Sequence, residues 1–153
     1  MRRLADALYG MAVALWVGGL WAIGYLAVPV LFAQLADRML AGRLAGFMFA
    51  GIAWAGFACG AYLLACLFSW HGREVFRSWS FRLILLMLVL AAVGHFGLQP
   101  QMEALKAQAW PQAVMTTELG RRFGALHGIA SIVYLIQSLA GLGLAAMPAP
   151  GRR

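Results

Sequence analysis

The sequence predicts an all-α integral membrane protein, in which one domain (1–153) consists of a four-helix bundle with little mass outside the bilayer. Three observations support this fold class. The chain is 63% hydrophobic and only 11% charged, unlike a soluble globular protein. Its six tryptophans, nine phenylalanines and 18 glycines are typical of lipid-embedded helices. The charged residues gather in short clusters between four long apolar segments.

The net charge of +7 has two possible interpretations: it indicates either a nucleic-acid partner or the signal that orients membrane helices. Because the basic residues fall between apolar segments, where they orient membrane helices, the second reading is favoured. We therefore expect the lipid bilayer as the partner of this chain, and no nucleic acid.

The four apolar segments give the transmembrane helices in order. A spanning helix needs about 20 predominantly apolar residues, and three of the segments exceed that length. The third has a shorter apolar core, Leu83–Leu98, which Ser and Trp residues extend at interfacial depth. The expected spans cover residues 7–33, 44–70, 79–98 and 118–147.

The connections differ in length. The first two are short, which favours antiparallel helical hairpins. In the third, Pro100 suits the end of one helix and the first turn of another. Since Met102 and Leu105 share one face of the residues that follow, we expect a short interfacial helix over residues 101–110.

Orientation follows from the positions of lysine and arginine near the spans. A cytoplasmic N-terminus places seven basic residues inside and five outside, a bias that favours both termini in the cytoplasm of a bacterial inner membrane. The inside set is Arg2, Arg3, Arg73, Arg77, Arg82, Arg152 and Arg153, and the outside set is Arg38, Arg43, Lys106, Arg121 and Arg122.

Two histidines lie inside the apolar segments at matching depth. His95 is near the end of the third span and His127 is near the start of the fourth. If they meet, their imidazoles suit a haem b iron, or a copper or zinc ion, with Tyr25 and Met48 at similar depth. The alternative, which the absence of a wider ligand cluster favours, is that each histidine hydrogen-bonds a neighbouring helix and no cofactor binds.

The fourth span carries the most specific polar pattern. His127, Ser131, Tyr134 and Ser138 follow at intervals of four, three and four residues, which places them on one helical face. This stripe either lines a site within the bundle or holds helices together. Small residues also repeat at close-packing intervals, and the glycines expected to pack helices are Gly18, Gly19, Gly56, Gly60, Gly120, Gly124 and Gly128.

Several motifs together resemble a known family. They are Trp-x-Gly-Gly at Trp16–Gly19, Pro-x-Leu-Phe at Pro29–Phe32, the start of the second span at Ala41–Phe49, and Phe-x-x-Leu-His-x-x-x-Ser at Phe123–Ser131. Over nearly the whole chain the sequence resembles the bacterial branch of the family named after transmembrane protein 205, DUF4149. That family is in turn distantly similar to copper-resistance protein D. Among the polar residues of this chain, His127 is the one at a position that matches the shared motif.

Two functions remain from the sequence. No P-loop, dinucleotide-binding glycine pattern, zincin motif or nucleophile elbow is present, which gives no positive indication of an enzyme. The first hypothesis is an accessory or structural membrane protein that packs into a homo-oligomer or a larger complex. The alternative is a haem b or copper protein, with a redox role, that uses His95 and His127.

Overall fold

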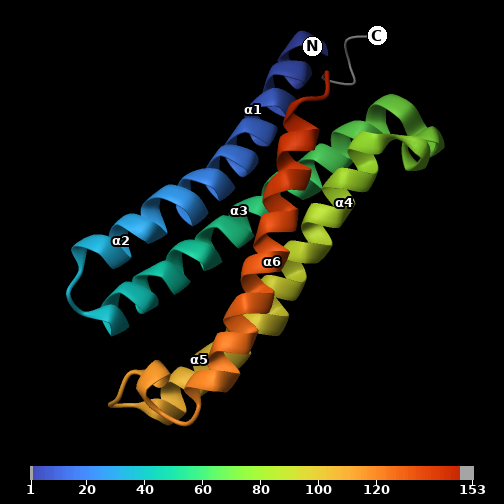
Figure 1. Ribbon diagram of the computed structural model, residues 1–153. Helices are drawn as coiled ribbons and strands as arrows, with labels where there is room; N and C mark the ends of the chain where they lie inside the picture. The colour runs from blue at the N-terminus through green and yellow to red at the C-terminus, as the bar shows by residue number, and fades with distance from the viewer. Residues whose placement is uncertain (1, 149–153) are drawn as a thin grey trace.

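The computed structural model describes residues 2–148, and throughout this part of the chain the regular structure is helical (Figure 1). Arg152 and Arg153, which enter the orientation count, lie outside the described residues. The elements are α1 (Arg2–Trp21), π-helical η1 (Ala22–Ala27), α2 (Val28–Gln34), α3 (Arg38–His71), 3₁₀ η2 (Gly72–Arg77), α4 (Trp79–Ala92), π-helical η3 (Val93–Leu98), α5 (Gln99–Ala109), 3₁₀ η4 (Val114–Thr116) and α6 (Gly120–Ala145).

Four helical segments are long and apolar enough to cross a membrane, which confirms the predicted fold class. They run over Leu4–Gln34, Arg38–Arg77, Trp79–Ala109 and Gly120–Ala145, with lengths of 31, 40, 31 and 26 residues. Because a bilayer requires only about 20 residues, the first three extend beyond its hydrocarbon core or tilt within it. The chain is a multi-pass membrane protein.

The third helix differs in one respect from the expectation. α5 occupies the segment expected to form a separate interfacial helix, but it begins directly where η3 ends, so one helix continues through Pro100 to Ala109. A proline inside an α-helix removes one backbone bond, and its ring collides with the carbonyl four residues earlier. Here the Gln99 N–H bonds instead to the Gly94 carbonyl, five residues back, and this wider turn accommodates the ring.

The first helix also accommodates an internal proline by means of a π-helical turn. η1 precedes Pro29 as η3 precedes Pro100, and the Val28 N–H bonds to the Ile23 carbonyl five residues back. Both π-helical turns therefore start seven residues before a proline. Neither proline ends its helix.

Local sequence sets the other helix boundaries. Asp37 caps α3, since its Oδ1 accepts from the N–H groups of Met39 and Leu40 at 2.8 and 3.1 Å. Ser78 caps α4 through the N–H of Phe81 at 3.2 Å. Gly72 ends α3 with a φ of 53°, a conformation that favours glycine.

The packed core lies toward the end of the bundle that carries both termini. α1 and α4 each pack against both α3 and α6. Toward the opposite end the helices diverge, with α2 and the start of α3 on one side and α5 and the start of α6 on the other (Figure 1). The largest fully buried hydrophobic side chains are Trp16, Leu20, Leu63, Leu67, Val75, Ile84 and Met87.

Trp16 depends on a glycine of the neighbouring helix. Its indole is completely buried, and a Cβ added to Gly56 would lie 3.0 Å from Cε2, 3.1 Å from Cδ1 and against Nε1. A contact of that kind lets α1 and α3 approach closely. Gly51, on the same helix, is exposed and has no atom within 4 Å of its added Cβ.

We predict that Gly56→Ala destabilises the bundle by about 1–3 kcal/mol, because a rigid indole in a full core has no room to move. Thermal unfolding in detergent micelles measures the effect. The control Gly51→Ala makes the same change where space is open and should leave the midpoint unchanged or slightly raised. Equal midpoints for the two variants would contradict this account of the Trp16 contact.

Candidate functional site

Tyr134, in the middle of the predicted polar stripe, joins α6 to the first helix. Its hydroxyl donates to the Leu20 carbonyl at 2.7 Å, and the backbone N–H of Gly24 faces the oxygen of that tyrosine hydroxyl. In a regular α-helix the Gly24 N–H would bond to that carbonyl. The tyrosine hydroxyl therefore sits in the backbone ladder where η1 widens the helix.

Glycine is required at position 24 for this insertion. A Cβ there would overlap the Tyr134 ring and lie 3.0 Å from its Oη. Aromatic neighbours surround the ring: Phe49 of α3 packs edge to face at 5.1 Å between centroids, and Tyr25 lies at 6.1 Å. Tyr134 thus contacts the first helix and α3 at the level where the bundle begins to open.

The two serines of the stripe bond within α6. Ser131 Oγ donates to the His127 carbonyl and Ser138 Oγ to the Tyr134 carbonyl, each at 2.8 Å. Ser138 is fully buried, and its own carbonyl accepts from Trp21 Nε1 at 3.3 Å. This half of the stripe holds α6 to α1.

The N-terminal half of the stripe is exposed. His127 and Ser131 are exposed, although they share a face with Tyr134. His127 is seven residues from Tyr134, so the two side chains point within about 20° of each other and are about 10 Å apart along the axis. His127 therefore points toward the side of α6 that faces η1 and α2, where the helices diverge.

His95 is bound into a separate set of contacts. Its Nδ1 lies 3.1 Å from Gln99 Oε1, and Gln99 Nε2 donates to the Gly46 carbonyl of α3 at 3.0 Å. Because the amide nitrogen must donate to that carbonyl, its oxygen faces the imidazole, and His95 donates from Nδ1. The ring packs against Trp54, Phe57 and Phe96, with centroids 4.8–6.3 Å away.

A chain of contacts along α5 runs from Gln99 toward His127. A Cβ on Gly46 would lie 3.6 Å from Glu103 Oε1, so Glu103 and Gln99 share this part of α3. Glu103 forms an ion pair with Lys106 at 2.8 Å. The Lys106 ammonium is 5.8 Å from the centre of the Phe123 ring, which in turn stacks on His127 at 6.0 Å and 9°.

The two histidines therefore lie at opposite ends of this series of contacts and do not touch each other. In the described residues their recorded partners have no member in common. Tyr25 packs with Trp21 and Tyr134, away from His95, and Met48 is half-buried without a recorded polar contact. Within the part of the chain described, no three His, Cys, Asp or Glu residues gather as metal ligands.

The glycines expected to pack helices fall into two groups. Gly19, Gly56, Gly60 and Gly120 have close neighbours: Ile52, Trp16, Leu88 and the Met115 backbone, respectively. Gly18, Gly124 and Gly128 have none within 4 Å and are exposed. The second group leaves open surface on α1 and α6.

Sequence reasoning missed Gln99, Glu103 and Lys106 as members of one polar set. The successive intervals from His95 to Gln99, Glu103 and Lys106 are four, four and three residues, which is a helical spacing. The expectation that the helix ends at Pro100 hid this pattern. Phe123 had no such signal, because its role depends on α5 packing beside α6.

Comparison with known proteins identifies the family of this chain. A family model described as "Domain of unknown function (DUF4149)" matches residues 11–111, more than half of the chain. The protein belongs to the DUF4149 family. The match contains Trp16, Pro29, His95 and the Gln99–Lys106 segment, whereas His127 and Tyr134 lie beyond it. No curated protein and no solved structure matches this DUF4149 chain.

We predict that Tyr134→Phe lowers the stability of this DUF4149 protein by about 1 kcal/mol, since the Leu20 carbonyl loses a donor in a dry environment. For a chain of this size the melting midpoint should fall by about 2–4 °C. Tyr25→Phe is the matched control, because its hydroxyl has no recorded hydrogen bond within residues 4–148. An equal loss in both variants would contradict this account, because the Tyr134 hydroxyl would then contribute no more than a hydroxyl that has no hydrogen bond in the described residues.

Proposed function

We propose that this protein is an accessory membrane protein that packs against other transmembrane helices, in a homo-oligomer or a larger complex. The observation that carries the proposal is the surface of α6 at Gly124 and Gly128. Both glycines are exposed, and a Cβ on either meets no atom within 4 Å. Two small residues one turn apart let a second helix approach closely.

The use of glycine elsewhere in the chain supports this proposal. Gly19, Gly56 and Gly60 each receive a large side chain from a neighbouring helix, so this sequence builds contacts between helices in that way. The outward glycines of α6 offer the same kind of surface without an internal partner. Leu135, Leu139 and Leu142 continue the exposed apolar surface further along α6.

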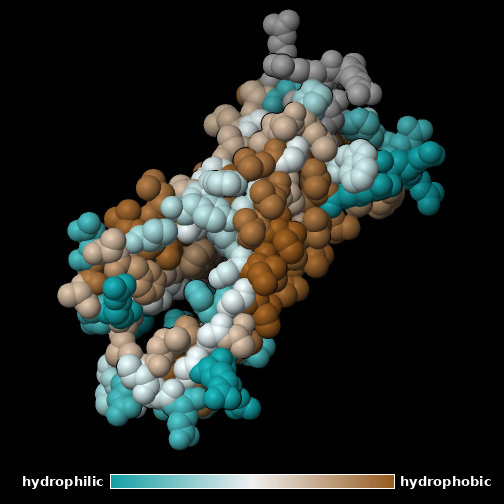
Figure 2. All heavy atoms as spheres, in the orientation of Figure 1, coloured by the Kyte–Doolittle hydropathy of each residue, from teal (hydrophilic) through white to brown (hydrophobic). Residues whose placement is uncertain are grey.

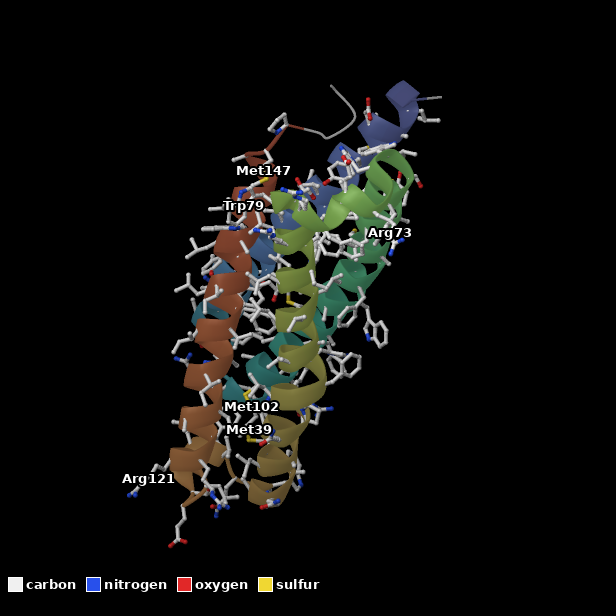
Figure 3. All side chains as sticks on the ribbon, turned by 90° about the vertical axis from the view of Figure 1, so that its right-hand side faces the viewer. Met39, Arg73, Trp79, Met102, Arg121 and Met147 are labelled. Atoms are coloured by element: carbon white, nitrogen blue, oxygen red, sulfur yellow. The ribbon has the colours of Figure 1, made fainter. Side chains whose placement is uncertain are left out.

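We also propose a bacterial inner membrane with both termini in the cytoplasm. An even number of spans puts the two ends of the chain on one side, and the N- and C-terminal helices end near each other (Figure 1). Arg73 lies at that end and Arg121 at the opposite end (Figure 3). The majority of the basic residues, seven of twelve, falls on the proposed cytoplasmic side.

We predict that Gly128→Leu disrupts the assembly without unfolding the bundle, because the new side chain blocks the approach of a second backbone but meets none of its own. The measurement is particle mass after extraction in native nanodiscs, without detergent. Gly51→Leu, at an equally open glycine of α3, should preserve the assembly. Wild-type particles holding a single copy and no other protein would overturn the proposal.

The alternative, a haem b or copper protein using His95 and His127, receives less support from the geometry. A site shared by two imidazoles requires them to converge, whereas His95 packs among aromatic rings beside α3 and His127 stacks on Phe123. Gln99 also engages Nδ1 of His95, which leaves only Nε2 as a ligand. The likeness to copper-resistance protein D remains the main reason to test it.

We therefore expect protein purified from haem-supplemented cells to show no Soret band and to carry no stoichiometric copper by elemental analysis. A band that both His95→Ala and His127→Ala abolish, with expression retained, would establish the alternative. His71→Ala, at the exposed C-terminal end of α3, is the control for general effects of histidine loss.

A further inference from the structure

A cavity of about 860 Å³ lies where α1 begins and α6 ends, at the end of the bundle that carries both termini. Asp6, Tyr9 and Gly10 of α1 line one wall, and Leu144 and Met147 line the other. A second observation confirms the open space, since a Cβ on Gly10 would meet no atom within 4 Å. The volume is in the range of sites that hold small molecules, and the proposed packing function does not use it.

The walls of this cavity change from polar to apolar with depth. Figure 2 shows hydrophilic side chains gathered toward the ends of the molecule and hydrophobic ones between them. Asp6 lies just inside the first span, which begins at Leu4, while Val13 and Ala14 line the cavity about 10 Å further along α1. An occupant that fits both levels is amphipathic, with its polar part at the membrane surface.

The hydroxyl of Tyr9 has no hydrogen-bond partner at the wall of this cavity. The residue is only 4% exposed, and its Oη is one of two buried side-chain polar atoms without a recorded partner in the described part of the chain. Ser80 lies beside it but donates to Met147 Sδ at 3.6 Å, and Met147 marks this end of the molecule in Figure 3. Because an unpaired buried hydroxyl is unfavourable, an acceptor atom in the cavity would stabilise this arrangement.

Asp6 adds a carboxylate to the same cavity. It is half-buried, and within residues 4–148 no hydrogen bond or ion pair of its carboxylate is recorded. Asp6 and Tyr9 are three residues apart on one face of α1, so their Cβ atoms are separated by about 5–6 Å. A ligand that satisfies both side chains carries a cationic donor and an acceptor joined by one short link.

We propose that the cavity binds one phosphatidylethanolamine molecule from the leaflet at the end that carries the termini. The ammonium donates to the Asp6 carboxylate, and the phosphate, two carbons away in this lipid, accepts from the Tyr9 hydroxyl. An acyl chain lies along Gly10 and Val13. Phosphatidylglycerol has no cation, and the quaternary ammonium of phosphatidylcholine has no N–H group, so neither lipid can make the hydrogen bond to Asp6.

The test is native mass spectrometry of the full chain equilibrated in nanodiscs of equal phosphatidylethanolamine and phosphatidylcholine. We expect one retained phosphatidylethanolamine, enriched about tenfold, the gain for one hydrogen bond to a charged group. Asp6→Asn should lower the enrichment, whereas Glu74→Gln, at an exposed position of η2, should not. Equal retention of the two lipids by the wild type would overturn the proposal, and it is the result expected if a basic residue of the chain neutralises Asp6 instead.

Two further variants separate a ligand site from an unused space. Tyr9→Phe should reduce the enrichment; a tyrosine with a structural role alone would lose only an unpartnered hydroxyl, and retention would not change. Gly10→Leu fills the cavity and should abolish retention, whereas Gly51→Leu, at an equally open glycine of α3, should not. Should Gly10→Leu fail to fold, Tyr9→Phe keeps the test.

The occupant itself is checked by removing residues 149–153, which follow directly on the cavity-lining Pro148. The proposal expects the same enrichment in this shortened chain as in the wild type. Enrichment that appears only after the removal would assign the cavity to the chain's own end and would contradict the proposal, as would full enrichment in Tyr9→Phe or in a folded Gly10→Leu.

Discussion

A peptide group inside a bilayer must find its hydrogen-bond partner within the protein, because the lipid offers none. This chain places a proline inside two of its four spanning helices and thereby removes a backbone donor from each. In both cases a π-helical turn precedes the proline and moves the carbonyls away from its ring. In the first helix the turn also admits the Tyr134 hydroxyl, which satisfies the Leu20 carbonyl from a neighbouring helix. The hydrogen bond between α6 and α1 therefore depends on the π-helical turn.

The bundle consequently has two unlike ends. Near the termini, Trp16, Leu63 and Ile84 are completely buried and the helices are in close contact. Past the level of Tyr134 the helices diverge, and the side chains that remain in contact are increasingly polar. Tight packing at one end fixes the helices well enough for the other end to stay open.

Much of the fold follows from the sequence by elementary rules. Hydropathy and length fix four spanning helices, and Asp37 and Ser78 are ordinary caps whose side chains accept from the first turn. The continuation through Pro100 does not follow, because a proline is compatible with either a helix end or a π-helical turn. Only the packing of η3 and α5 against α3 and α6 decides between them.

The candidate site was predictable in part. The interval pattern of His127, Ser131, Tyr134 and Ser138 identifies one face of α6, but not that Ser138 is buried while His127 is exposed. That difference arises from the angle between helices, which a sequence pattern does not contain. The depth of His95 and His127 was likewise read from position alone, whereas the direction of each ring depends on its neighbours.

The matching π-helical turns also alter the rotational phase of the helices that contain them. Each turn accommodates an extra residue, so the faces beyond Pro29 and Pro100 are rotated by about 100° from the direction that uninterrupted α-helical counting gives. α2 and α5 therefore present different stripes from those that α1 and α4 would have continued. A single-residue deletion within one of these turns would rotate the far half of that helix by about 100° relative to the neighbour against which it packs, α3 for α2 and α6 for α5.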